Sequence, residues 1–248
     1  MTLSADLSGL VAVVTGASSG IGAHFCSVLT RNGATVVAAA RRKDRLDALV
    51  AAGDAAVAVG CDVGAAPDVA ALIDAAVALG GPDIVVNAAG FGDDHPAKDV
   101  PMDEFRRTID VDLTATFAVA QAAGNAMPGG GAIINIASIL GLVGAWPINQ
   151  AAYCAAKGGV VNLTRQLGAE WAKDGIRVNA IAPGWFPSEQ TDDMFADERA
   201  MAWIRRNTPM GRPGRLDELD GALLLLASPT STFLTGQTLA VDGGWTAR

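Results

Sequence analysis

Short runs of consecutive hydrophobic residues alternate along the chain with longer segments rich in alanine and leucine. The short runs are typical of buried strands and predict strands at residues 10–14, 34–40, 55–59, 83–86, 132–137, 176–181 and 237–241. The longer segments predict helices at residues 21–31, 43–51, 67–79, 102–127, 150–173 and 216–227. Because strands separated by helices require crossover connections, the pattern predicts an α/β fold with a doubly wound parallel sheet and helices on both faces.

The pattern of predicted strands and helices shows no boundary between domains. It contains no internal repeat and no linker-like segment, so we expect a single domain over residues 1–248. The stretch from Pro183 to Pro213 is the least regular, and we expect it to be a loop that serves as a substrate lid, at about residues 184–213, rather than a domain boundary.

Composition narrows the class of protein. A chain of this length can bury a complete core without a disulfide or a metal. Its 18 basic and 26 acidic residues give a net charge of −8 with no concentrated basic stripe, so nucleic acid is not an expected partner. Cys26, Cys61 and Cys154 form no CxxC pair, and we expect them to be thiols in a reducing compartment.

Two further features bear on location. Residues 1–9 lack the basic region and the long apolar run of a secretory signal. Residues 113–156 contain no Asp, Glu, Lys or Arg, but Pro128 and the glycines at 129–131 interrupt this stretch, which favours an uncharged protein core over a membrane span. We therefore expect a soluble, cytoplasmic protein without membrane contact.

A glycine-rich turn, TGASSGIG at residues 15–22, joins the first predicted strand to the first helix. Gly16 permits the tight turn, Gly20 lets the backbone approach a pyrophosphate, and Gly22 allows close packing of helix on strand. The free N–H groups at the start of the helix favour phosphate. No Gly-Lys-Ser/Thr follows, so the turn is not a Walker A loop and predicts a dinucleotide site.

The residues after the second predicted strand select the coenzyme in such folds. An acidic side chain there would bind the adenosine ribose of NAD, whereas Arg41 and Arg42 follow Ala40 in this chain. A guanidinium group can hold a 2′-phosphate through two hydrogen bonds. We therefore expect NADP(H) rather than NAD(H), with Arg41 the stronger candidate and Arg42 either a ligand or a solvated residue at a helix start.

Candidate catalytic side chains lie around the fifth predicted strand and the helix that follows it. Tyr153, the one tyrosine in the chain, and Lys157 are four positions apart on that helix, so they share one face. The surrounding segment is apolar, and Ser138 ends the strand at the edge where ligands of parallel sheets bind. These residues predict acid–base chemistry beside a nicotinamide.

In order and spacing, these motifs resemble the short-chain dehydrogenase/reductase family. The resemblance spans nearly the whole chain and rests on residues 15–22, Cys61-Asp62-Val63, Asn87-Ala88-Ala89-Gly90, Ser138, Tyr153-x-x-x-Lys157, Arg177-Val178-Asn179 before Pro183-Gly184, and Val241-Asp242-Gly243-Gly244. It implies a Rossmann-like fold and an oxidoreductase that interconverts a ketone and a secondary alcohol, as a homodimer or homotetramer that associates through helix 150–173.

The resemblance also implies roles. Tyr153 would donate and accept the proton, Ser138 would orient the substrate oxygen, and Lys157 would favour the phenolate and bind the nicotinamide ribose. With the arginines added, the residues expected to bind the coenzyme are Gly16, Ser18, Ser19, Gly20, Ile21, Gly22, Arg41, Arg42, Asp62, Val63, Asn87, Ala88, Gly90, Tyr153, Lys157, Pro183, Gly184, Phe186 and Ser188. No metal is expected, and Asp93-Asp94-His95 is interpreted as a solvated loop.

Three departures from the family pattern stand out. Asp112, counted with the catalytic residues, replaces an asparagine whose main-chain carbonyl usually holds a proton-relay water, so we expect activity but an affected relay. The Ser138–Tyr153 spacing of 15 positions exceeds the usual one, which should reshape the substrate loop near Trp146. Ser188 stands in place of a threonine and keeps its hydroxyl.

Several substrate classes remain open. We favour a ketoreductase or alcohol dehydrogenase for a small or medium, partly apolar substrate, with Phe91, Trp146, Trp185 and Phe186 either lining its pocket or packing the lid. A 3-oxoacyl carrier-protein reductase would need a basic docking patch, for which Arg205, Arg206, Arg212 and Arg215 are candidates in an otherwise acidic chain. The motifs are also compatible with a sugar or polyol dehydrogenase, and with a catalytically silent NADP(H) sensor that binds a partner protein.

Overall fold

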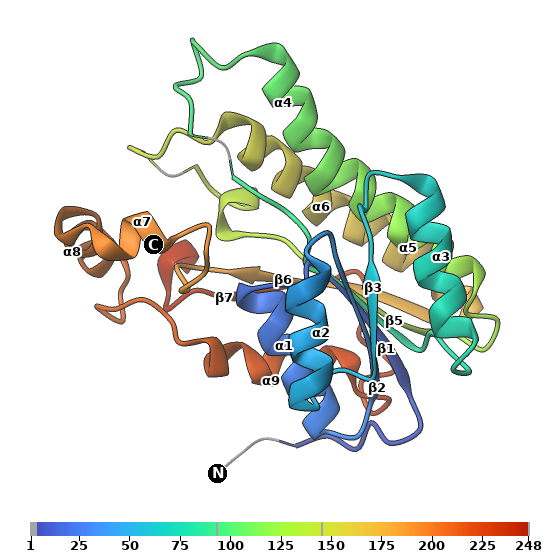
Figure 1. Cartoon of the computed structure of the whole chain (residues 1–248). Coiled ribbons are helices and arrows are strands. Elements are labelled where there is room, and N and C mark those ends of the chain that lie inside the picture. Colours follow the sequence, from blue (N-terminus) through green and yellow to red (C-terminus); the bar gives the residue numbers. More distant parts are fainter. Residues whose placement is uncertain (1–3, 93, 145, 248) are drawn as a thin grey trace.

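The computed structural model describes residues 4–92, 94–144 and 146–247, and seven of its strands form one parallel sheet in the order β3-β2-β1-β4-β5-β6-β7 (Figure 1). The strands are β1 (Val11–Thr15), β2 (Thr35–Ala40), β3 (Val57–Gly60), β4 (Ile84–Asn87), β5 (Gly131–Ile136), β6 (Ile176–Pro183) and β7 (Thr238–Val241). The predicted doubly wound parallel sheet is therefore confirmed, with strand ends shifted by one or two residues.

Helices cover both faces of the sheet (Figure 1). One face carries α1 (Gly20–Arg31), α2 (Lys43–Ala52) and α9 (Asp220–Ala227), and the other carries α3 (Ala66–Val77), α5 (Ala115–Asn125) and α6 (Ala151–Glu170). Two short helices, α7 (Asp192–Ala196) and α8 (Glu198–Asn207), extend beyond the carboxyl edge of the sheet beside the C-terminus. In the part of the chain that is described, no helix has the length and apolarity to span a membrane.

The core explains why the strand sequences are continuous hydrophobic runs. Along β1, Ala12 and Val14 pack under α1 and α9, whereas Val11 and Val13 pack under α3 and α5. Both faces are covered, so every residue of β1 is buried and no polar alternation is needed.

From β1 the chain adds β2 and β3 on one side, and after β3 it crosses back to add β4 on the other side of β1, so the strand order reverses there. β1 and β4 are therefore neighbours in the sheet although β2 and β3 lie between them in sequence. Backbone segments meet closely there, because a Cβ on Gly16 would lie 2.7 Å from the carbonyl carbon of Ala88. The hydroxyl of Thr15 accepts hydrogen bonds from the N–H groups of Ala88 (3.1 Å) and Ala89 (3.3 Å). Such a reversal point opens a crevice at the carboxyl ends of the strands.

Two parts of the fold differ from the sequence prediction. The stretch 183–213 was expected to be an irregular loop, but it contains α7 and α8. The long helix predicted at 102–127 is divided into α4 (Met102–Ile109), a π-helical turn (Asp110–Thr114) and α5. Local sequence did not reveal this turn, since the residues on both sides have helical dihedral angles.

Two glycines of α6 provide a matched test of this packing. A Cβ on Gly168 would lie 2.6 Å from the Cα of Gly236, whereas one on Gly158 would meet nothing closer than Gly141 O at 3.7 Å. We expect Gly168→Ala to destabilise the fold by about 1–3 kcal/mol through overpacking. The control Gly158→Ala should be neutral or stabilising by up to about 1 kcal/mol, because alanine favours helix. Urea unfolding measures both, and equal effects would contradict this account of α6 packing.

Candidate active site

A cavity of about 1020 Å³ lies at the carboxyl ends of the strands. Its walls come from the turn between β1 and α1, from the segments that follow β2, β3, β4 and β5, from the start of α6 and from the segment expected to be a lid, residues 184–213, which is called the lid below. It therefore collects residues from widely separated parts of the sequence, at the edge where the topology predicts a ligand.

Nearly every predicted site residue lines this cavity. The lining includes Gly16, Ser18, Ser19, Gly20, Ile21, Gly22, Arg41, Arg42, Asp62, Val63, Ala88, Gly90, Asp112, Ser138, Tyr153, Lys157, Pro183, Gly184, Phe186 and Ser188. Asn87 is the exception among the predicted residues, since it does not line the cavity. It is 3% exposed and donates to Asn135 Oδ1 (3.0 Å), so it joins β4 to β5 beneath the cavity floor.

The glycine turn is shaped as a cradle. A Cβ on Gly22 would lie 2.8 Å from the carbonyl carbon of Gly16, so a side chain there would force α1 away from the turn. Gly20 adopts a positive φ of 53°. Ser19 is the N-cap residue of α1, but its side chain does not cap the helix. The first N–H groups of α1 are therefore left for a ligand at this end of the cavity.

The two arginines after β2 differ in their surroundings. Arg42 donates to Ser18 Oγ from Nη2 (2.9 Å), to Ser19 Oγ (3.0 Å) and to Glu189 of the lid (2.8 Å). The Arg41 side chain lines the cavity without a hydrogen bond or ion pair to a described residue. Sequence reasoning favoured Arg41, and the structure places both guanidinium-bearing residues at the same end of the cavity.

Three catalytic candidates meet at the opposite part of the cavity. Ser138 is 7% exposed, and its Oγ accepts a hydrogen bond from the N–H of Leu140 (3.1 Å), which fixes the side chain at the end of β5. Tyr153 and Lys157 lie one helical turn apart in α6, with Lys157 Nζ 5.5 Å from the centre of the tyrosine ring. All three residues line the cavity, as their spacing predicted.

Lys157 is buried and is held by two oxygen atoms. Its Nζ donates to the carbonyl of Ile136 (3.0 Å) and forms an ion pair with Asp112 Oδ1 (3.0 Å). Burial by itself lowers the pKa of this ammonium, but the charges of Asp112 and of a phenolate at Tyr153 raise it, and the net direction is upward. We infer that Lys157 is a permanent cation at neutral pH.

Asp112 lies in the π-helical turn and is completely buried. The main-chain carbonyl that was expected to hold a relay water accepts a hydrogen bond from Thr116 Oγ1 (2.9 Å). Its carboxylate contacts Lys157 directly and accepts from the N–H of Phe91 (3.2 Å). In this chain the contact between the π-helical turn and the lysine is thus an ion pair, a consequence of the substitution that sequence reasoning did not foresee.

The first part of the lid segment borders the cavity on the side of β6. Ser188 lies against the glycine turn. A Cβ added to Gly20 would be only 3.2 Å from the Cβ of Ser188. Thr191 fixes this geometry by accepting a hydrogen bond from the N–H of Ser188 (2.9 Å) and donating to the carbonyl of Phe186 (2.8 Å). Trp185 is 8% exposed and packs edge-on against Trp203 and Trp245 at centroid distances of 5.7 and 5.6 Å. The tryptophan cluster therefore attaches the lid to the C-terminal segment.

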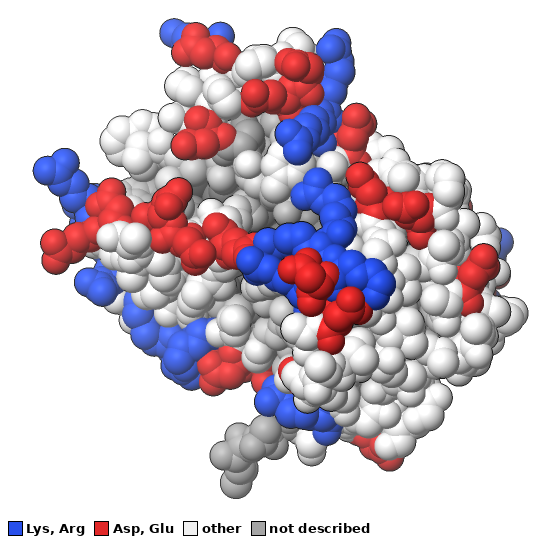
Figure 2. All heavy atoms as spheres, viewed as in Figure 1, with Lys and Arg blue, Asp and Glu red and all other residues white. Residues whose placement is uncertain are grey.

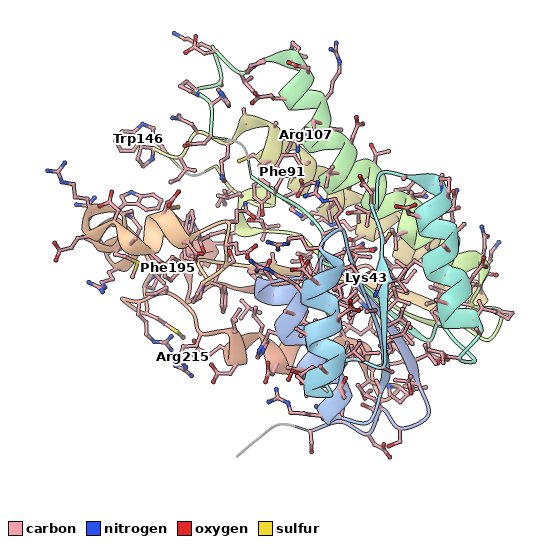
Figure 3. The ribbon with its side chains drawn as sticks, viewed as in Figure 1. Lys43, Phe91, Arg107, Trp146, Phe195 and Arg215 are labelled. Carbon is pink, nitrogen blue, oxygen red and sulfur yellow. The ribbon has the colours of Figure 1, made fainter. Side chains whose placement is uncertain are left out.

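The structure distinguishes the aromatic residues that line the cavity from one that does not. Phe91, Trp185 and Phe186 line the cavity, and the guanidinium of Arg107 lies 5.1 Å above the Phe91 ring (Figure 3). Trp146 is 89% exposed on an outer loop and does not line the cavity (Figure 3).

The loop Asp93-Asp94-His95 is described only in part, because Asp93 lies outside the described residues. His95 of this loop pairs with Glu104 at 3.1 Å. No group of three His, Cys, Asp or Glu side chains that could hold a metal occurs among the described residues.

Sequence reasoning missed several residues of the cavity wall. Among them are Gln150 at the start of α6 and Glu189, Gln190, Thr191 and Met194 of the lid. Their only signal is a position near Ser188 or Tyr153, because no spacing rule connects a lid residue to the opposite wall.

Comparison with known proteins agrees with this site. A family model described as Enoyl-(Acyl carrier protein) reductase matches residues 16–246. The chain is 43% identical to a cis-4-hydroxycyclohexanecarboxylate dehydrogenase of Sinomonas cyclohexanicum, and the match covers 96% of each protein. It is also similar to the crystal structure of a short-chain type dehydrogenase/reductase from Mycobacterium marinum (38% identity, TM-score 0.92, 98% of each chain). A crystal structure of a gluconate 5-dehydrogenase from Burkholderia cenocepacia J2315, in complex with NADP and tartrate, is similar too (36% identity, TM-score 0.92, 98% of this chain and 97% of that one).

These similarities extend over almost the whole chain and agree with the parallel sheet, the glycine turn and the Tyr153–Lys157 pair. The chain belongs to the short-chain dehydrogenase/reductase family, as its motifs predicted.

The Lys157–Asp112 pair predicts a pH-dependent stability. The raised pKa of Lys157 means that the pair stabilises the fold fully below the ordinary lysine pKa of 10.5, and that this contribution is lost as the pH rises through the folded value. Asp112→Asn leaves a buried cation unpaired, and we expect it to cost about 3 kcal/mol at pH 7. The gap from wild type should narrow as the pH rises above 10.5 toward the raised pKa of Lys157, where the amine deprotonates.

Urea unfolding at several pH values measures this gap. Asp110→Asn is the matched control, because Asp110 is exposed in the same π-helical turn and forms no ion pair with a described residue. A gap for Asp112→Asn that is equally large at pH 7 and at high pH would contradict the ion-pair account.

Proposed function

We propose that this protein is an NADP(H)-dependent oxidoreductase that interconverts a ketone and a secondary alcohol. The observation that carries the proposal is the convergence of Ser138, Tyr153 and Lys157 on one cavity whose other end is a phosphate-binding glycine turn. The relatives named as dehydrogenases support the same reaction class. A catalytically silent sensor would have no physical need for a buried, paired ammonium beside a tyrosine.

The roles follow from the positions of the side chains. When bound, the nicotinamide coenzyme supplies or accepts a hydride. The Tyr153 phenol donates a proton to the carbonyl oxygen during reduction and accepts one during oxidation. The Ser138 hydroxyl, fixed by Leu140, orients the same oxygen. Lys157 stabilises the phenolate through its charge and offers its remaining N–H to the ribose hydroxyls.

The choice of NADP(H) rests on the end of the cavity beside β2. Arg41 and Arg42 line it, and no acidic side chain stands directly after β2 to bind a ribose 2′-hydroxyl. The similar gluconate 5-dehydrogenase was crystallised with NADP, which supports the same coenzyme here. Asp62 and Val63 follow β3 at this end, and we assign them to the adenine.

The substrate region combines apolar and amide side chains. Phe91, Leu140, Trp185 and Met194 supply apolar wall, while Gln150 and Gln190 supply hydrogen-bonding groups. This mixture suits a small or medium ring or chain that carries polar substituents. The named relatives act on a hydroxycyclohexanecarboxylate and on gluconate, so a sugar or polyol is the second candidate substrate class.

A carrier-protein substrate is less well supported. Of the four arginines proposed as a docking patch, Arg212 pairs with Glu218 (2.7 Å) and Arg215 pairs with Asp217 (3.1 Å). The charge of these two arginines is therefore largely neutralised before any acidic partner arrives.

We further propose that the chain works as a single domain with a lid at about residues 184–213, in a cytoplasmic homo-oligomer, a tetramer or a dimer. Ala155, a small side chain that is exposed on α6, supports close approach of a second copy along this helix.

Replacing Tyr153 by phenylalanine tests the chemistry. We expect turnover to fall at least about a hundredfold, because the proton donor is gone while the ring and its packing remain. Coenzyme affinity, measured by fluorescence titration, should change little. Val111→Ala is a control for a small change in the cavity wall, and an unchanged rate for Tyr153→Phe would reject the proposed reaction.

Replacing Arg41 by alanine tests the coenzyme assignment separately. Loss of a charge-assisted hydrogen bond to phosphate should weaken NADPH binding about tenfold or more. NADH binding should be nearly unaffected. Arg106→Ala removes the same charge from an exposed position of α4 that does not line the cavity. If both variants bind NADPH as the wild type does, Arg41 does not contact the 2′-phosphate.

A further inference from the structure

A contact between segments far apart in sequence closes the end of the cavity beside α2. Glu189 of the lid accepts hydrogen bonds from Arg42 Nη1 (3.2 Å) and Nη2 (2.8 Å), and it also pairs with Arg45. Figure 2 shows a band of acidic side chains, over the region of α7, that meets a basic cluster over the start of α2. We call the Glu189–Arg42–Arg45 contact the clasp.

The clasp uses the part of Arg42 that would recognise a phosphate. The Nη1 and Nη2 atoms face Glu189, while Nε (3.2 Å) and Nη2 (2.9 Å) face Ser18 Oγ. Each edge of the guanidinium that can form two parallel hydrogen bonds is thus occupied within the protein. A phosphate bound through two such bonds needs one of these edges.

We propose that Glu189 is a specificity-determining residue, an internal anion that occupies the position on Arg42 which the 2′-phosphate of the coenzyme takes. A coenzyme with a 2′-phosphate must displace Glu189, whereas one with a 2′-hydroxyl need not. The clasp therefore reduces the preference for NADP(H) over NAD(H). This inference rests on the proposed coenzyme site.

Displacement is physically reasonable. The Arg42 and Glu189 side chains are 43% and 42% exposed, and exposed ion pairs contribute little net stability. A phosphate monoester carries close to two negative charges at neutral pH, against one for the carboxylate. Arg41, which has no acidic partner among the described side chains, adds attraction for the phosphate but not for Glu189.

Protonation does not open the clasp under ordinary conditions. The hydrogen bond from Arg42, followed by one from Ser19, lowers the pKa of Glu189 to about 2. The carboxylate is thus ionised at neutral pH, so a competing anion rather than protonation opens the clasp.

Isothermal titration of the full-length protein with two nucleotides tests the proposal. Adenosine 2′,5′-bisphosphate carries the 2′-phosphate, and 5′-AMP does not. We expect Glu189→Gln to raise the affinity for the bisphosphate by about three- to fivefold, the range for an exposed ion pair, with 5′-AMP unchanged. Asp193→Asn is the control, because Asp193 is an exposed lid carboxylate without an ion pair to a described residue.

The outcomes separate this inference from the proposed function. If the wild type prefers the bisphosphate and Glu189→Gln leaves that preference unchanged or weakens it, Glu189 is not a competitor and the clasp proposal is overturned. An equal gain from Asp193→Asn overturns it too, since it would reflect general charge. If the wild type and Glu189→Gln both bind the two nucleotides equally, the NADP(H) assignment itself fails.

Discussion

A buried ammonium group sets the geometry on which the site depends. The side chain of Lys157 is 6% exposed, and a charge taken out of water must be met by an opposite charge and by hydrogen-bond acceptors. Asp112 and the carbonyl of Ile136 meet it, so the π-helical turn, β5 and α6 are joined at one atom. Tyr153 lies one turn earlier on α6 and is thereby directed into the cavity.

The same constraint explains Gly90. A Cβ at this position would collide with Asp112 and would lie 3.2 Å from Lys157 Nζ, so the backbone after β4 can approach the ion pair only without a side chain. The direct ion pair also changes the electrostatics of catalysis. Asp112 offsets part of the field that the ammonium exerts on Tyr153, an effect that a neutral asparagine at this position would not have.

The lid is held by two kinds of interaction with different consequences. At one end Trp185, Trp203 and Trp245 stack edge-on in an apolar cluster, which is costly to separate in water. At the other end Glu189 holds exposed arginines, a contact that another anion can replace. The tryptophan end is therefore the fixed attachment, and the end beside the coenzyme region is the exchangeable one.

The sequence by itself determined the elements whose signals are local. Hydrophobic periodicity located the strands, Gly16, Gly20 and Gly22 located the glycine turn at the cavity, and the four-residue spacing placed Tyr153 and Lys157 on one helical face. Ser138 followed as well, because the carboxyl ends of parallel strands share one edge of the sheet. Side-chain period and the positions of strand ends depend on neighbouring residues, which is why they can be inferred without coordinates.

Only the tertiary structure decided which distant groups pair. Glu189 and Arg42 are 147 positions apart, and no periodicity relates a lid to a helix start. Asp112 was recognised as a substitution, but its ion pair depends on a π-helical turn that ordinary helical sequence does not announce. Asn87 likewise lies under the cavity floor because β4 and β5 are adjacent there. Such pairings depend on how the elements pack, a balance of burial and charge that is settled only when the whole chain has folded.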